Sequence, residues 1–221
     1  GSVGQFVVEC GYSHSAFDDP IVHAGHEGMS HRHDFFGNVS TAAGSTYESL
    51  LDADTTCDQQ LDTAAYWAPS LLAGDGTPVV PIRSVAYYRA GAGVDPSTVE
   101  PYPPGLMMIA GDAGATEAQP TGVVAWTCSS GGRRLAEPPR CFDEAELRLL
   151  ITFPDCWNGS DIDTANHTDH VAYSGGDGCP ESHPVAIPQL QFAIDYPAVD
   201  DPYSLVLASG PLITWAQGTM A

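Results

Sequence analysis

The histidines are the residues of this sequence with the widest choice of chemistry, and they fall into two groups. Five lie within residues 14–33 and three lie within residues 167–183, with none between the two groups. A neutral imidazole binds transition metals, and imidazole also transfers protons near neutral pH. Scattered surface histidines are not expected to concentrate in this way, so the pattern predicts a site formed where the two segments meet. Local turn chemistry or a histidine-rich surface is the alternative.

His31 and His33 have the spacing of a metal-binding pair. In an extended segment, side chains at positions i and i+2 point to the same face, roughly 6–7 Å apart, and can bind one ion. A third ligand must come from elsewhere, and we expect it from His170 or His183, with Asp169 orienting its neighbour His170. The sequence thus predicts a divalent transition metal, zinc or copper, bound by these four histidines.

Acid–base chemistry without a metal fits the same two segments. A carboxylate beside an imidazole sets its tautomer and raises its basicity for proton transfer. Both segments are rich in aspartate, although a single aspartate is more often a turn former. Carboxylate pairs would also suit glycoside hydrolysis. The catalytic residues that we expect are His31, His33, Asp34, Asp169, His170 and Asp19.

Other site types match the sequence less well. Asp161, Asp163 and Asn166 resemble part of a calcium loop, but the glycine and the closing glutamate are absent, so calcium is a weaker expectation than a transition metal. The residues around His31 and His33 also resemble the start of a cupin motif, without its glutamate. The sequence contains neither the Gly-x-Ser-x-Gly motif of serine hydrolases nor a phosphate-binding loop.

The charge balance excludes several partners. The chain of 221 residues has 28 acidic side chains and seven basic ones, all arginine, which gives a formal net charge of −21. Such a chain repels nucleic acids and anionic lipid surfaces. No apolar run approaches the roughly 18 residues of a membrane span. We therefore expect neither nucleic-acid nor membrane binding, and we expect a monomer.

Six cysteines indicate an oxidising compartment. Their number is even and none forms a Cys-x-x-Cys pair, which favours three disulfides and a secreted protein over a zinc knuckle. Six cysteines allow 15 pairings, and the spacing does not choose among them rigorously. The pairing Cys128–Cys141 is favoured because the two residues flank a connection between strand-like runs, and Cys156–Cys179 and Cys10–Cys57 would then follow.

The remaining pattern predicts a single all-β domain over residues 1–221, a β-sandwich or jelly roll with long loops and minor short helices, stabilised by disulfides. Glycine and proline break the chain into short pieces, and turn-separated strands are typical of such folds. Two stretches, residues 14–46 and 157–183, lack strand character and are expected to be functional loops. Helical turns are expected at 45–53 and 143–147. The expected strands are 5–9, 79–89, 122–128, 147–153, 189–196 and 205–207.

Several motifs together resemble the domain of unknown function 1996 family. They are SHRHDFFG, the Ala65–Pro69 run AYWAP, PYPPG at 101–105, FPDCWNG at 153–159, DHVAY at 169–173 and CPESHPVAIPQL from Cys179. The resemblance covers nearly the whole chain and implies a secreted protein in a polysaccharide-rich setting. It implies His31, His33, His170 and His183 as the family's landmark histidines, and a further segment beyond residue 221.

We therefore expect a secreted carbohydrate-active protein, a metal- or histidine-dependent enzyme acting on cell-wall or plant polysaccharide. Trp157, Tyr173 and Tyr66 are the aromatic residues expected to stack on sugar rings. The main alternative is a non-catalytic wall-binding or structural module whose histidines brace long loops. A metal-dependent phosphoesterase is a third interpretation, because the same ligands activate water.

Overall fold

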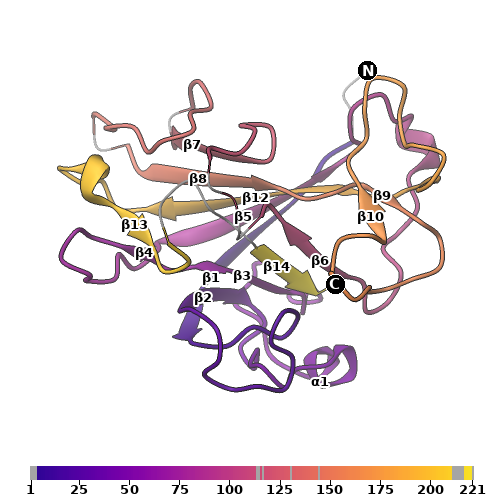
Figure 1. Ribbon diagram of the computed structural model, residues 1–221, viewed down its shortest axis with the longest axis horizontal. Coiled ribbons are helices and arrows are strands. Elements are labelled where there is room, and N and C mark those ends of the chain that lie inside the picture. Colours follow the sequence, from indigo (N-terminus) through magenta and orange to yellow (C-terminus); the bar gives the residue numbers. More distant parts are fainter. Residues whose placement is uncertain are drawn as a thin grey trace.

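The fold is given by a computed structural model, which describes residues 4–112, 115, 117–129, 131–143, 145–210 and 217–220. Short strands dominate these residues, as the turn-rich sequence predicts (Figure 1). The expected all-β class is thus confirmed. The strands are β1 (Phe6–Ala16), β2 (His33–Gly37), β3 (Ala65–Pro69), β4 (Leu71–Leu72), β5 (Arg83–Arg89), β6 (Met107–Ala110), β7 (Val124–Cys128), β8 (Leu147–Thr152), β9 (Cys156–Trp157), β10 (Val171–Ala172), β11 (Val185–Ala186), β12 (Gln189–Tyr196), β13 (Val206–Leu207) and β14 (Gln217–Met220).

Nine of these strands form one antiparallel sheet in the order β6-β14-β3-β2-β1-β5-β12-β8-β7. The sheet curls over, because strands from its two ends bury side chains in the same hydrophobic cluster. Met108 of β6 shares that cluster with Leu149 of β8 and Trp126 of β7. In Figure 1, β7, β8 and β12 cross the upper part of the molecule, and β2, β3 and β14 lie below them. The curled sheet therefore encloses the core between two layers, as in a sandwich.

The helices are short. The helix α1 (Tyr47–Leu51) lies within the expected range 45–53 and begins at Thr46, whose hydroxyl accepts a hydrogen bond from the backbone N–H of Ser49. Two 3-10 turns occupy Pro96–Thr98 and Pro202–Ser204. The helical turn expected at 143–147 is wrong for the described residues: β8 begins at Leu147, and Asp143 has a left-handed φ of 55°, which an N-cap residue does not adopt.

The expected strands are confirmed with changed ends, and the first long loop is corrected. Strand β12 has the expected bounds, whereas β1 continues to Ala16 and β2 lies inside the stretch 14–46 that was expected to lack strands. All five residues of β2 are buried, because β2 pairs with β1 on one side and β3 on the other. Central position in the sheet, and not local propensity, makes this segment a strand.

The three disulfides have the favoured pairing. Cys10–Cys57 joins β1 to the segment after α1, Cys128–Cys141 closes the connection between β7 and β8, and Cys156–Cys179 closes a loop of the second histidine segment. That loop begins in a small sheet in which β9 pairs with β10 and β11. The disulfide and the small sheet thus fix both ends of the segment that carries His167 and His170. Among the described residues, no helix is long and apolar enough to cross a membrane.

Candidate functional site

A pocket of about 480 Å³ lies where the two histidine segments meet. The first segment contributes one wall, the loop at 166–168 contributes the other, and the end of β6 completes the lining. Three imidazoles and two aspartates are among the lining groups. The full lining is Asp19, Val22, His23, Ser30, His31, Ile109, Gly111, Asp112, Asn166, His167 and Thr168.

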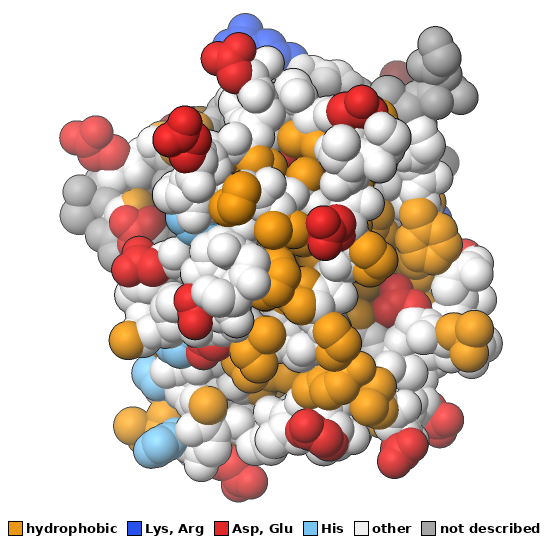
Figure 2. Space-filling view, turned by 90° about the vertical axis from the view of Figure 1, so that its right-hand side faces the viewer, with side chains coloured by type: hydrophobic (Ala, Val, Ile, Leu, Met, Phe, Trp, Pro, Cys, Tyr) orange, Lys and Arg blue, Asp and Glu red, His pale blue; other side chains and the backbone are white. Residues whose placement is uncertain are grey.

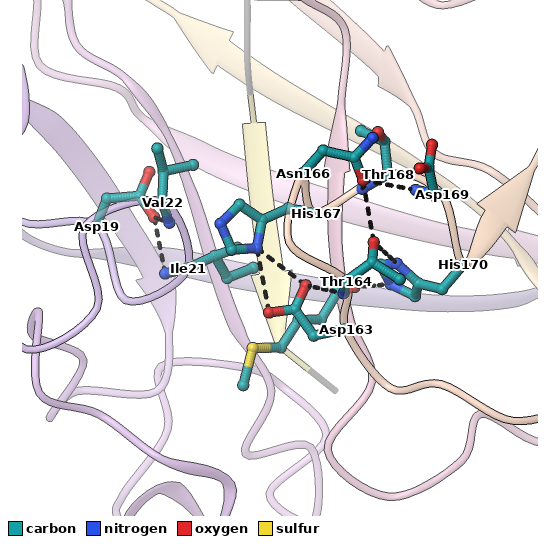
Figure 3. Close-up of polar contacts among 11 residues, drawn as sticks. Asp19, Ile21, Val22, Asp163, Thr164, Asn166, His167, Thr168, Asp169 and His170 are labelled. Atoms are coloured by element: carbon teal, nitrogen blue, oxygen red, sulfur yellow. Dashed lines mark hydrogen bonds and ion pairs between the residues drawn. The ribbon is translucent and has the colours of Figure 1, made fainter.

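Asp19 is held rigidly in the first wall. Its Oδ1 atom accepts hydrogen bonds of 2.9 Å from the backbone N–H groups of both Ile21 and Val22, a turn that short aspartate side chains commonly stabilise (Figure 3). The second carboxylate oxygen, Oδ2, lies 4.0 Å from Nε2 of His33. That distance is too long for a hydrogen bond.

His33 is the first residue of β2, and it is almost completely buried. Its Nδ1–H donates a hydrogen bond of 2.8 Å to the backbone carbonyl of Asp18. Because a carbonyl can only accept, this bond places the proton of the neutral ring on Nδ1 and leaves a lone pair on Nε2. The lone pair therefore lies on the side of the ring that is closer to the Asp19 carboxylate.

His31 packs beside His33, with 4.3 Å between the ring centroids. Its Nε2 atom is buried and has no hydrogen-bond partner among the described residues. Burial lowers the pKa of His31 to about 4, with a further lowering by His33. Burial also lowers the pKa of His33 to about 4, although the bond to Asp18 opposes this. Both rings are therefore neutral at pH 7.

The opposite wall carries an Asp–His pair. The Nδ1–H of His167 donates to the carboxylate of Asp163, with distances of 2.9 and 3.1 Å to its two oxygens. His167 has a left-handed φ of 60°, a conformation that is uncommon for residues other than glycine. The ring lies between the Asp19 turn and the Asp163 loop (Figure 3). The pair leaves Nε2 of a pocket-lining imidazole as a proton acceptor.

Comparison with known proteins agrees with the sequence motifs. The family model described as domain of unknown function (DUF1996) matches residues 19–219. The chain belongs to the DUF1996 family. Among curated proteins and solved structures, no match was found.

Of the four histidines implied as DUF1996 landmarks, His31 and His33 lie side by side, but His170 and His183 are bonded elsewhere. The Nε2–H of buried His170 donates 2.7 Å to the carbonyl of Met107, and its Nδ1 lies 3.2 Å from the Thr164 hydroxyl. His183 donates from Nε2 to the carbonyl of Asp169 at 3.0 Å. These two rings hold the second loop in place, and neither lines the pocket.

Two of the expected catalytic aspartates also lie outside this pocket of the DUF1996 chain. Asp34 is buried, and its Oδ1 accepts hydrogen bonds of 2.6 Å from the hydroxyls of Ser15 and Ser70. Burial raises the pKa of Asp34, while both serines act to lower it. Asp169 is exposed and meets His183 through its backbone carbonyl. Asp34 of β2 thus links β1 to the residue that follows β3.

The three aromatic residues expected to bind sugar do not line the pocket. Tyr66 is 1% exposed and packs in the main core, so in this structure its ring has no free face for a sugar. Trp157 is half-buried, and its indole N–H donates to the carbonyl of Asp161. Tyr173 is 39% exposed as a residue, and its hydroxyl donates to the carbonyl of Thr152 in a partly buried hydrogen bond.

The sequence-based choice of residues missed His167, His23 and the end of β6. His167 was left out although Asp163 precedes it by four residues in the same loop, which is the signal that could have found it. Nothing in the sequence pointed to Ile109, Gly111 or Asp112. No group of three or more histidine, cysteine or acidic side chains within the described ranges already has metal-binding geometry.

Proposed function

We propose that this DUF1996 chain is an extracellular enzyme that acts on polysaccharide, with the substrate bound in the pocket between the two histidine segments. The observation that carries the proposal is the Asp163–His167 pair, which places an oriented imidazole in that pocket. In this proposal His167 is the general base.

The chemistry follows from the hydrogen bond to Nδ1. With its proton held by the Asp163 carboxylate, His167 presents the lone pair of Nε2 and can accept a proton from water or a sugar hydroxyl. The carboxylate also stabilises the imidazolium that forms when the proton arrives. This arrangement requires no movement of the second loop, since the Cys156–Cys179 disulfide and the bonds of His170 and His183 already hold it.

The lining of the pocket supports a hydroxyl-rich and uncharged substrate. Ser30, Asn166 and Thr168 supply hydroxyl and amide groups, while Val22 and Ile109 supply apolar surface of the kind that contacts the face of a sugar ring. The carboxylates of Asp19 and Asp112 in the lining repel negatively charged phosphate and uronate groups. Figure 2 shows acidic side chains scattered over one whole face of the molecule and basic ones confined to its upper edge.

The extracellular part of the proposal is supported by the three disulfides, which persist in oxidising compartments. The polysaccharide part is supported by the implied setting of the family and by the net charge of −21, which disfavours large polyanions.

One set of contacts favours a second candidate, a non-catalytic wall-binding module. Five of the eight histidines hydrogen-bond to backbone carbonyls and line no part of the pocket. His14, for example, donates from Nε2 to the carbonyl of Thr41 at 2.9 Å. In that candidate the histidines serve to order the loops that contact the glycan.

The two candidates differ in whether products form. The protein is incubated with neutral wall polysaccharides, namely cellulose, xylan, β-glucan and chitin, with and without added zinc or copper, and soluble products are measured by mass spectrometry. We expect products from the wild type and from His26→Gln, whose ring contacts the carbonyl of Ala24 away from the pocket. We expect none from His167→Gln. Glycan binding without products from any polysaccharide would favour the wall-binding module and overturn the enzyme.

A further inference from the structure

Two hydrogen-bond acceptors, Nε2 of His33 and Oδ2 of Asp19, lie 4.0 Å apart in the first wall, too far for a hydrogen bond. The Nε2 of His33 carries a lone pair, because the ring proton is on Nδ1 in the bond to Asp18. Asp19 Oδ2 lies 4.0 Å away, and the backbone bonds to Oδ1 hold the carboxylate in that direction. Two acceptors at this separation repel each other unless a proton or a cation lies between them.

A polar atom of His31 lies in the same region and has no hydrogen-bond partner among the described residues. The Nε2 of His31 is buried and makes no hydrogen bond among the described residues, and its ring is 4.3 Å from that of His33. A buried nitrogen without a partner costs free energy. Such an atom in a natural protein calls for a partner, such as a water molecule or an ion.

We propose that His31, His33 and Asp19 bind one divalent transition-metal ion, zinc or copper, through the two Nε2 atoms and Oδ2. Nitrogen donors favour these metals over calcium and magnesium, which prefer oxygen ligands. His23 also lines the pocket and offers a further imidazole on the same wall. The set differs from the one that the sequence predicted, because His170 and His183 are replaced by Asp19.

The geometry requires a small closure. Ligand atoms at about 2.1 Å from a tetrahedral ion lie roughly 3.4 Å from each other. The His33 and Asp19 atoms are 4.0 Å apart, so they must approach by about half an ångström, and the half-buried His31 must turn toward them. This need for closure accounts for the absence of a ready-made ligand group among the described residues.

The surroundings of the two fixed ligands are those of a metal site. A ligating histidine usually donates its other N–H to a carbonyl or carboxylate, as His33 does to Asp18. The Asp19 carboxylate is likewise oriented by the N–H groups of Ile21 and Val22. These bonds exist before any ion arrives, which lowers the ordering cost of binding.

The metal site deepens the proposed function, and any catalytic role of the bound ion rests on that function. A bound ion would activate water or polarise a substrate oxygen in the same pocket that His167 lines. Metal binding itself needs no glycan, so the two proposals can fail separately.

The test measures metal binding on protein that carries no histidine tag and has been treated with a chelator. Zinc and copper binding are followed by calorimetry, the number of ions per chain by elemental analysis, and the ligand geometry by the visible spectrum of the cobalt form. We expect one ion per chain in the wild type. We expect at least about tenfold weaker binding in His31→Ala and in Asp19→Asn, the latter a change of nearly equal size.

The controls are His26→Ala, which removes an exposed histidine of the same segment, and His183→Ala, which removes a ring that the sequence pattern favoured. Both should bind zinc like the wild type. Circular dichroism and the midpoint of thermal unfolding show whether each variant is folded, and His31→Gln takes the place of His31→Ala if the alanine variant does not fold. Unchanged zinc affinity in folded His31 and Asp19 variants, loss of the ion in His183→Ala, or no binding by the wild type would each overturn the site.

Discussion

The Nδ1 atom of His167 lies 2.9 Å from Oδ1 of Asp163, and this bond orients the one ring of the second histidine segment that lines the pocket. In Asp163→Asn the side chain has nearly the same size but loses its negative charge and can present an N–H to the ring. We expect turnover of the polysaccharide to fall by about 10²-fold or more, because the wrong tautomer is favoured.

The measurement for this variant is the initial rate of product release. Asp177→Asn is the matched control, since Asp177 is exposed in the same disulfide-closed segment and lines no part of the pocket. Equal rates in the two variants would show that the pair does not act in proton transfer.

A buried ion pair stabilises the sheet far from the pocket. Asp195 of β12 is completely buried and accepts bonds of 2.6 and 2.8 Å from Arg148, and one of 3.0 Å from Arg83. Asp195→Ala leaves the cations of two strands without this partner, so the free energy of unfolding should fall by about 3 kcal/mol or more. Glu9→Gln removes an exposed contact to Arg83 and should cost less than about 1 kcal/mol. Urea denaturation measures both, and similar losses would contradict the assignment.

Removal of one disulfide should weaken binding in the pocket, and removal of another should leave binding unchanged. Replacing Cys156 and Cys179 by alanine should lower the free energy of unfolding by about 2–4 kcal/mol and also weaken glycan binding, because the closed loop carries His167. Replacing Cys128 and Cys141 should destabilise without changing binding, since the pocket has no residue from that loop. Calorimetric binding at a temperature where both variants are folded distinguishes the outcomes.

Five tyrosines with raised pKa values should make the folded state sensitive to high pH. Burial raises the pKa of Tyr66, Tyr88, Tyr102, Tyr173 and Tyr196 above the ordinary value of 10. The unfolded chain therefore loses these protons first, so stability is retained below about pH 10 and falls as the pH rises above it. We expect the phenolate absorbance of these five to appear together with unfolding. Their smooth titration while circular dichroism stays native would contradict this.

Local pattern was enough to predict the class of the fold and the extent of β12, whereas the cysteine pairing that it favoured, and that the structure has, was one of 15 that the spacing left open. Alternating β-branched and aromatic residues between turns predict strands directly, as they do for β12. The pattern did not find β2, because a strand of five residues with two charged or polar side chains at its start is recognisable only from its neighbours β1 and β3.

The amino-acid sequence by itself determined that two histidine segments meet and that His31 and His33 lie side by side. Tertiary structure alone decided which imidazoles remain open to a ligand. Nε2 of His170 donates to the carbonyl of Met107, which is 63 positions earlier in the chain, whereas His167 bonds Asp163 through Nδ1 and lines the pocket. The physical reason is that a buried polar atom takes whatever partner the folded chain brings within about 3 Å, and spacing along the sequence does not specify that partner.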